Sequence, residues 1–208
     1  HPTAQVLHRL DLIRPIAEAD AIINLGKLKT HNLTALTLCV KNLFGVVPGA
    51  LKIGYHSKLQ DRERFAQGLL DILSFVHPVL HILDAIVGME GEGPSGGEPR
   101  AIGLLLAGAD GLAVDLVAGA AVGFRPRQVL TTRVATEQGL CSGDLGDVTL
   151  VGDAVTLPVV ADYRQGIEAA MDPGLLPKPL RRLLQSANPR IAQGVGSALD
   201  GATAQRLT

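Results

Sequence analysis

Two neighbouring stretches of the chain carry opposite charges. Residues 27–60 contain five lysines and two histidines, His31 and His56, but no acidic residue. Residues 65–99 contain five acidic residues and neither lysine nor arginine. An ordinary solvent-exposed surface mixes the two signs. The segregation therefore indicates a polar site that draws on both stretches.

The lysine-rich stretch opens with Lys27, Lys29, Thr30 and His31, which follow directly on a short apolar run. Leucine and valine then recur at helical spacing and predict a helix over 33–43. Helix N-termini at the carboxyl ends of strands present free N–H groups to anions. We expect the two lysines, with Thr30 beside them, to bind a phosphate or a carboxylate. The alternative is that the lysines are solvated loop residues.

Three polar residues share one face of that predicted helix. Thr34, Thr37 and Lys41 recur at spacings of three and four, opposite a leucine-rich face. An ordinary amphipathic helix would show the same pattern. Lys41 and His31 are candidates for proton transfer, and Asn42 is a candidate ligand-binding residue at the end of the helix.

The acidic stretch contains a glycine-rich loop over 88–97, with five glycines in ten residues. Glycine lets the backbone approach a ligand closely, so Gly91 and Gly93 are candidate ligand-binding residues. Glu90 could act as a base. The alternative is a flexible loop without a role. We expect the stretch from 84 to 97 to meet the lysine-rich stretch at the carboxyl ends of adjacent strands.

A divalent metal is also compatible with the acidic stretch, because carboxylate oxygens and imidazole nitrogens are common metal ligands. The candidate ligands are Asp84, Glu90, Glu92 and His56.

Several classes of protein are excluded or disfavoured. The chain has no GxGxxG motif that opens a helix, no Walker loop and no GxSxG nucleophile elbow. A net charge of −1 disfavours nucleic acid as a partner. No uncharged apolar run reaches the roughly 18–20 residues of a membrane helix. Two distant cysteines form no CxxC pair, so we expect a cytoplasmic protein without disulfides.

Short apolar runs alternate with helical patterns along the first part of the chain. The predicted strands are 21–25, 79–84, 102–107 and 148–151, and the further predicted helices are 61–75, 111–122 and 127–138. This alternation predicts an α/β domain over 1–172, with a mostly parallel or mixed sheet of about four strands and helices on both faces. Residues 173–208 are punctuated by prolines and rich in arginine, which indicates a basic tail.

Three polar residues inside apolar runs have competing interpretations. Asp110 is expected to cap the helix over 111–122. Asp115 either lies on an exposed stripe of that helix or points into the site. His81 is expected to be a hydrogen-bonded core histidine.

The residue blocks resemble one known family, the domain of unknown function 362. The matching blocks are 23–31, 40–45, 84–91 and 151–153, together with Thr34, Thr37, His56, Asp110 and Asp115. In many members a ferredoxin-like module with CxxCxxC runs follows the domain, and these are known as iron–sulfur proteins. This chain has no such run, so no iron–sulfur cluster is expected in it. By this resemblance the chain looks like the second half of the family domain.

Together these patterns favour binding of a small anionic metabolite, with a divalent metal allowed, in a site lined by lysine, histidine and glutamate. The alternative is a non-catalytic scaffold that docks a ferredoxin-like redox partner. Charges that converge would favour the first hypothesis, and charges spread over a flat face the second. A homo-oligomer is compatible with both, and no membrane partner is expected.

Overall fold

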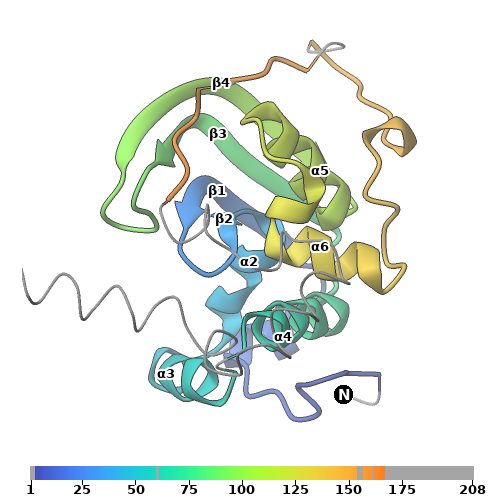
Figure 1. Cartoon of the computed structure of the whole chain (residues 1–208). Coiled ribbons are helices and arrows are strands. Elements are labelled where there is room, and N and C mark those ends of the chain that lie inside the picture. The colour runs from blue at the N-terminus through green and yellow to red at the C-terminus, as the bar shows by residue number, and fades with distance from the viewer. Residues whose placement is uncertain (1–2, 60, 154–156, 161, 167–208) are drawn as a thin grey trace, which may run out of the picture. The chain divides into compact units, whose positions relative to one another are not determined.

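A four-stranded mixed sheet forms the centre of the chain (Figure 1). The computed structural model describes residues 3–59, 61–153, 157–160 and 162–166. The strands are β1 (Ile23–His31), β2 (Ala35–Thr37), β3 (Leu80–Glu90) and β4 (Glu98–Gly108), in the order β2-β1-β3-β4. The central pair, β1 and β3, is parallel, and both outer pairs are antiparallel. The predicted α/β class and the mixed four-stranded sheet are confirmed.

Helices and short 3-10 turns connect and follow these strands. They are α1 (Arg14–Glu18), α2 (Cys39–Asn42), η1 (Leu43–Val46), α3 (Gly49–Lys58), α4 (Arg62–Val76), α5 (Gly111–Ala121), η2 (Pro126–Gln128), α6 (Leu130–Glu137) and η3 (Leu145–Asp147). The predictions for α4 and α5 are accurate to within one residue at each end. Asp61 and Asp110 cap these two helices by accepting hydrogen bonds from backbone N–H groups, as expected for Asp110.

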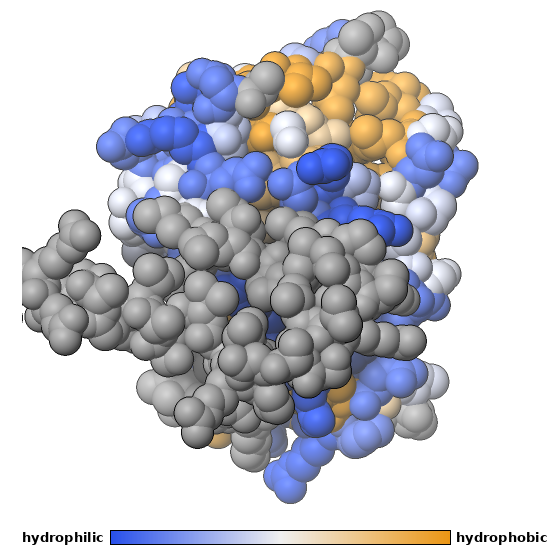
Figure 2. All heavy atoms as spheres, in the orientation of Figure 1, coloured by the Kyte–Doolittle hydropathy of each residue, from blue (hydrophilic) through white to orange (hydrophobic). Residues whose placement is uncertain are grey.

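The two faces of the sheet differ in what covers them. Leu28, Leu83 and Leu104 lie on the covered face and pack with α2 and α5. In Figure 2, seen from the side of α5, apolar residues gather over α5 and β4 with hydrophilic residues around them. On the opposite face, the described residues show exposed side chains instead of the expected second layer of helices. We call that surface the open sheet face; it consists of Ile23, Leu25, Lys27, Ile82, Asp84, Ile86 and Leu105.

The helix predicted over 33–43 is wrong. The chain instead turns back after β1 and forms β2, then the short helix α2 and the 3-10 turn η1. The turn is built locally: Nδ1 of His31 accepts hydrogen bonds from the backbone N–H groups of Leu33 and Thr34, and Ala35 takes a left-handed φ of 66°. The leucines that suggested a helix are buried from successive short elements rather than from one helical face.

The strand predicted over 148–151 is also absent. These residues have no regular secondary structure, and Val151 is almost fully exposed. The fourth strand is β2, in the stretch that was predicted as helix. The predicted tail over 173–208 lies outside the described residues, so the domain boundary stays a prediction.

Candidate functional site

Strand β1 continues to His31, six residues beyond its predicted end. Lys27, Lys29, Thr30 and His31 are therefore strand residues and do not stand at a helix start. The next α-helix, α2, begins at Cys39 and has four residues. The prediction of an anion site at the start of a helix over 33–43 is wrong, because no helix begins there.

Three half-buried lysines nevertheless come together from three elements. They are Lys29 on β1, Lys41 on α2 and Lys52 on α3. Burial and, to a smaller extent, the charges of Lys52 and Lys29 together lower the pKa of Lys41 to about 8. No ion pair links any of the three to an acidic residue in the part of the chain that the structure describes. We call these three residues the lysine cluster.

Two aromatic rings lie under the ammonium group of Lys41. Its Nζ is 5.2 Å from the ring centroid of Phe44 and 5.9 Å from that of Phe65. These contacts favour the charged form of Lys41 and work against the lowering of its pKa. The two rings also pack edge to face, with their centroids 5.5 Å apart. This contact keeps both rings in position beneath the amine of Lys41.

A buried hydroxyl group adjoins the lysine cluster. Thr37 lies directly opposite Lys29 in the antiparallel pair of β1 and β2, so both side chains are on the same face. The Oγ1 atom of Thr37 is buried and has no hydrogen-bond partner among the described residues. An unpaired buried hydroxyl is costly, and a bound ligand could satisfy it.

Lys27 has a partner and stands apart from the lysine cluster. Its Nζ is 2.7 Å from Oδ2 of Asp84, which lies directly opposite it on β3. The hydrogen bond from Lys27 and the backbone N–H of Ile86 lower the pKa of Asp84. This pair occupies the open sheet face, so two predicted site residues neutralise each other.

A buried amide and imidazole network ties α2 to β1. Nδ2 of Asn42 donates to Oδ1 of Asn24 at 2.8 Å and to the carbonyl of Leu25 at 2.9 Å. Nδ2 of Asn24 lies 3.0 Å from Nδ1 of His81. An amide nitrogen can only donate, so Nδ1 of His81 accepts and the imidazole is neutral. Burial likewise lowers the pKa of His81, which confirms it as a core histidine and makes Asn42 a positioning residue.

Asp115 anchors the start of α2 from the inside of the fold. Its carboxylate is fully buried and accepts hydrogen bonds from the backbone N–H groups of Cys39 at 2.7 Å and Val40 at 3.1 Å. Burial raises the pKa of Asp115 to about 7, although these two hydrogen bonds oppose the rise. The interpretation as an exposed residue is therefore wrong: Asp115 points into the interior of the fold and holds the start of α2, the helix that carries Lys41.

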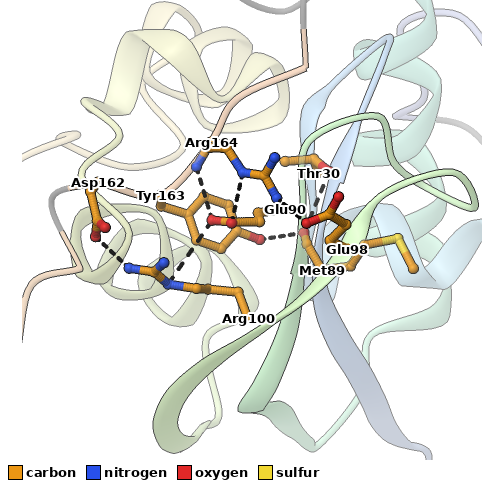
Figure 3. A network of polar contacts seen from close by, with 8 residues as sticks. All are labelled: Thr30, Met89, Glu90, Glu98, Arg100, Asp162, Tyr163 and Arg164. Carbon is orange, nitrogen blue, oxygen red and sulfur yellow. Dashed lines mark hydrogen bonds and ion pairs between the residues drawn. The ribbon is translucent and has the colours of Figure 1, made fainter.

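Glu90 lies in a different polar network, shown in Figure 3. Its buried carboxylate accepts from Nε of Arg164 at 2.8 Å and from the backbone N–H of Arg164 at 3.1 Å, while Arg100 lies 4.0 Å away. Burial raises the pKa of Glu90, but the contacts from Arg164 outweigh it and the net shift is downward. Arg100 in turn pairs with Asp162. A carboxylate held in this way is ionised and paired.

Two backbone groups hold the glycine-rich loop in place, one against β1 and one against Arg164. The N–H of Gly93 donates to Oγ1 of Thr30 at 3.1 Å, and the N–H of Gly91 donates to the carbonyl of Arg164 at 2.8 Å. A Cβ at residue 93 would overlap the carbonyl of Thr30, which explains why glycine is needed there. Both glycines, which were predicted to bind a ligand, make structural contacts within the chain.

The two charged stretches meet as expected, but not around one site. Lys27 contacts Asp84, and Thr30 contacts the loop. Lys29 is paired with Met89 in the register of β1 and β3, so its side chain and that of the next residue, Glu90, lie on opposite faces. The sheet itself therefore separates the lysine cluster from Glu90.

The family profile of the domain of unknown function DUF362 matches residues 1–120 of the chain. The chain belongs to this family. The thylakoid-associated protein sll1697 of Synechocystis sp. (strain ATCC 27184 / PCC 6803 / Kazusa) is 39% identical to it over 134 residues. The match covers 64% of this chain and 42% of the relative, so it spans less than half of that protein's length. No solved structure matches the chain.

The predicted metal ligands of this DUF362 chain do not gather in the described residues. Asp84 is paired on the open sheet face, Glu90 is paired on the other face, and Glu92 is exposed in the loop. The side chain of His56 lies outside the described residues. No group of three histidine, cysteine, aspartate or glutamate side chains in the described part of the chain is placed to hold a metal ion. None of the helices described there is long and apolar enough to span a membrane.

Sequence reasoning missed several residues that the fold of this DUF362 chain brings to these networks. Lys52 was counted only as one of five lysines, and its approach to Lys41 depends on how α3 follows η1. Arg100, Tyr163 and Arg164 carried no motif at all. The hydroxyl of Tyr163 donates to the carbonyl of Met89, and only the folded arrangement reveals that contact.

Proposed function

We propose that this DUF362 chain binds a small anionic molecule at the lysine cluster of Lys29, Lys41 and Lys52. The observation that carries the proposal is the convergence of three half-buried lysines with no acidic partner among the described residues. Holding like charges together costs free energy, which a phosphate or carboxylate would offset. Thr37 adds a hydroxyl that can donate to the same oxygen atoms.

Lys41 is the residue through which the site would respond to pH. With a pKa of about 8 it is mostly protonated at pH 7 and mostly neutral above pH 9. A bound anion would raise this pKa again, so binding takes up protons near pH 8. Anion affinity should therefore fall as the pH rises through about 8.

Lys41 is also the catalytic candidate that remains available. Among the other two, His31 accepts backbone hydrogen bonds in a turn, and Glu90 is paired with Arg164. In its neutral form Lys41 could accept a proton from a bound acid, since its pKa lies close to physiological pH. The class of ligand we propose is a small carboxylate or phosphate ester.

Isothermal titration with inorganic phosphate and with a small dicarboxylate tests the proposal. We expect Lys41→Gln to weaken binding by tenfold or more, about 1.4 kcal/mol. The matched control is Lys27→Gln, because Asp84 already neutralises Lys27. Equal affinity in the wild type and in Lys41→Gln, or no binding of either probe, would refute the proposed site.

Convergence of the charges favours this function over a docking scaffold. A docking patch for a redox partner would spread its lysines over a flat face, whereas Lys29 and Lys52 both act on Lys41. We further propose a cytoplasmic location, supported by two free cysteines, of which Cys39 is buried. Cell fractionation checks that location. The thylakoid association belongs to the name of the Synechocystis relative.

A further inference from the structure

The open sheet face exposes apolar side chains on three adjacent strands. Leu25 on β1 is 67% exposed, and Leu105 on β4 is 63% exposed. Ile23 and Ile86 are exposed to 56% and 55%. In the strand register, Leu25 lies opposite Ile82, and Asp84 lies opposite Leu105, so these side chains form one continuous surface.

This surface departs from the usual construction of a sheet. Parallel strands such as β1 and β3 are normally covered on both faces, whereas an antiparallel sheet that faces water carries polar residues on its exposed side. Here one face packs with α2 and α5, and the other presents isoleucine and leucine to solvent. Contiguous exposed apolar side chains of this kind mark an interaction surface.

We infer that a second copy of this chain covers the open sheet face, so that two sheets stack face to face about a two-fold axis. The inference does not depend on the proposed anion site. Its main support is the charge pattern within the face.

Within the open sheet face, Lys27 and Asp84 lie side by side 2.7 Å apart, and Lys29 follows Lys27 on the same face of β1. A surface on which a cation lies beside an anion is complementary to an identical surface related to it by a two-fold rotation. In the stacked pair, each Lys27 can face Asp84 of the partner subunit. The four charges then alternate in sign, while the surrounding leucines and isoleucines pack together. Such a pattern fixes the register of the dimer more than it adds affinity.

The size of the face sets the expected strength of the dimer. Three strands about 4.8 Å apart, each contributing some six residues, span roughly 300 Å² of sheet. Typical stable interfaces bury about 800 Å² on each partner. The dimer should therefore be weak, with a dissociation constant on the order of tens of micromolar.

Sedimentation velocity on the full chain, from about 1 to about 300 µM, brackets that constant. The wild type should shift from monomer to dimer over this range. Leu25→Glu and Leu105→Glu should each raise the dissociation constant at least tenfold. Val151→Glu is the control, because Val151 is exposed and belongs to none of the strands. All four proteins should show the same melting transition, since the substituted residues are exposed.

A charge swap tests the two-fold arrangement itself. Lys27→Asp places like charges opposite each other across the axis and should weaken the dimer several-fold at low salt. The double variant Lys27→Asp with Asp84→Lys should restore the affinity of the dimer. In that variant, opposite charges again face each other, both within each copy and between the two copies. A wild type that stays monomeric at the highest concentration would overturn the inference, and so would a dimer unaffected by both glutamate variants.

Discussion

The two charged networks of this chain differ in whether their charges are paired with charges of the opposite sign. Around Glu90, each carboxylate or guanidinium group has a partner of the other sign: Arg164 and Arg100 on one side, Glu98 and Asp162 beyond them. In the lysine cluster, three cations meet without an anion among the described residues. Paired charges hold segments of chain together, whereas unpaired charges of one sign leave an interaction to be made by a ligand.

The networks also differ in what they connect. Glu90 joins the end of β3 to Arg164, 74 positions later. The lysine cluster joins three elements within residues 29–52 and faces away from Glu90 across the sheet. We therefore expect substitutions at Glu90 to change stability, and substitutions at Lys41 to change binding and its pH dependence.

The largest expected effect on stability is that of Glu90→Ala. The side chain of Glu90 is 6% exposed and accepts two hydrogen bonds from Arg164. Losing these charge-assisted bonds should lower the free energy of unfolding by about 2–3 kcal/mol. Urea denaturation followed by circular dichroism measures the loss. A loss below about 0.5 kcal/mol would show that the pairing around Glu90 is not structural.

The matched control for Glu90 is Glu98→Ala. Glu98 pairs with the same arginine at 2.6 Å, but its side chain is 72% exposed. Solvent screens exposed pairs, so the loss should be below about 1 kcal/mol. If both variants lose the same stability, burial is not what distinguishes Glu90.

The contribution of Glu90 to the stability of the fold should also depend on pH. Its pKa in the folded chain lies below the ordinary value of 4.5. A carboxyl group with a depressed pKa contributes stability that is present above its unfolded pKa and is lost as the pH falls through its folded pKa. Wild type and Glu90→Gln should therefore differ in stability at pH 6 and converge toward pH 3.

A smaller effect on stability, in a different pH range, is expected from substitution of Lys41. Its pKa is about 8 in the folded chain, against 10.5 ordinarily. The unfolded chain then binds more protons between these two values, so stability rises as the pH increases from 8 to 10.5. Lys41→Met should remove this rise and leave the chain no less stable at pH 7. Thermal melts at pH 7, 8.5 and 10 check both statements.

The smallest effect is expected from Lys27→Gln. Lys27 and Asp84 are each more than 40% exposed, so water and salt screen their attraction. The free energy of unfolding should fall by less than about 1 kcal/mol and by even less at high salt. A loss above that value, measured at low protein concentration, would mean that the open sheet face is more enclosed than its exposure indicates.

Much of the sheet could be predicted from the sequence, because β3 and β4 contain short apolar runs typical of strands, although in β4 only Leu104 is buried. The end of β1 could not be predicted, since its buried positions are Gly26, Leu28 and Thr30 and its other positions are two lysines and a histidine. Local spacing also favoured a helix over 33–43, but contacts from outside that stretch decide its structure. Asp115, distant in sequence, accepts the N–H groups that start α2 at Cys39.

The candidate site could be predicted as a region but not as a set of residues. Charge segregation identified the stretch that contains Lys29 and Lys41. Which lysines remain unpaired depends on strand register, since only the alignment of β1 with β3 places Asp84 beside Lys27 and not beside Lys29. Likewise, Glu90 looked available because its partner, Arg164, lies outside any recognisable motif.

The hydrogen bonds of Asp115 bear on when the lysine cluster can form as the chain is made. Helix α2 has four residues and is too short to persist alone, and its first N–H groups rely on a carboxylate 76 and 75 positions later. A nascent chain that has not yet emerged beyond α5 lacks that carboxylate. Lys41 should then find its place over Phe44 and Phe65 only after α5 leaves the ribosome. The cationic cluster would thus form only after α5 has been made, although its three lysines precede α5 in the sequence.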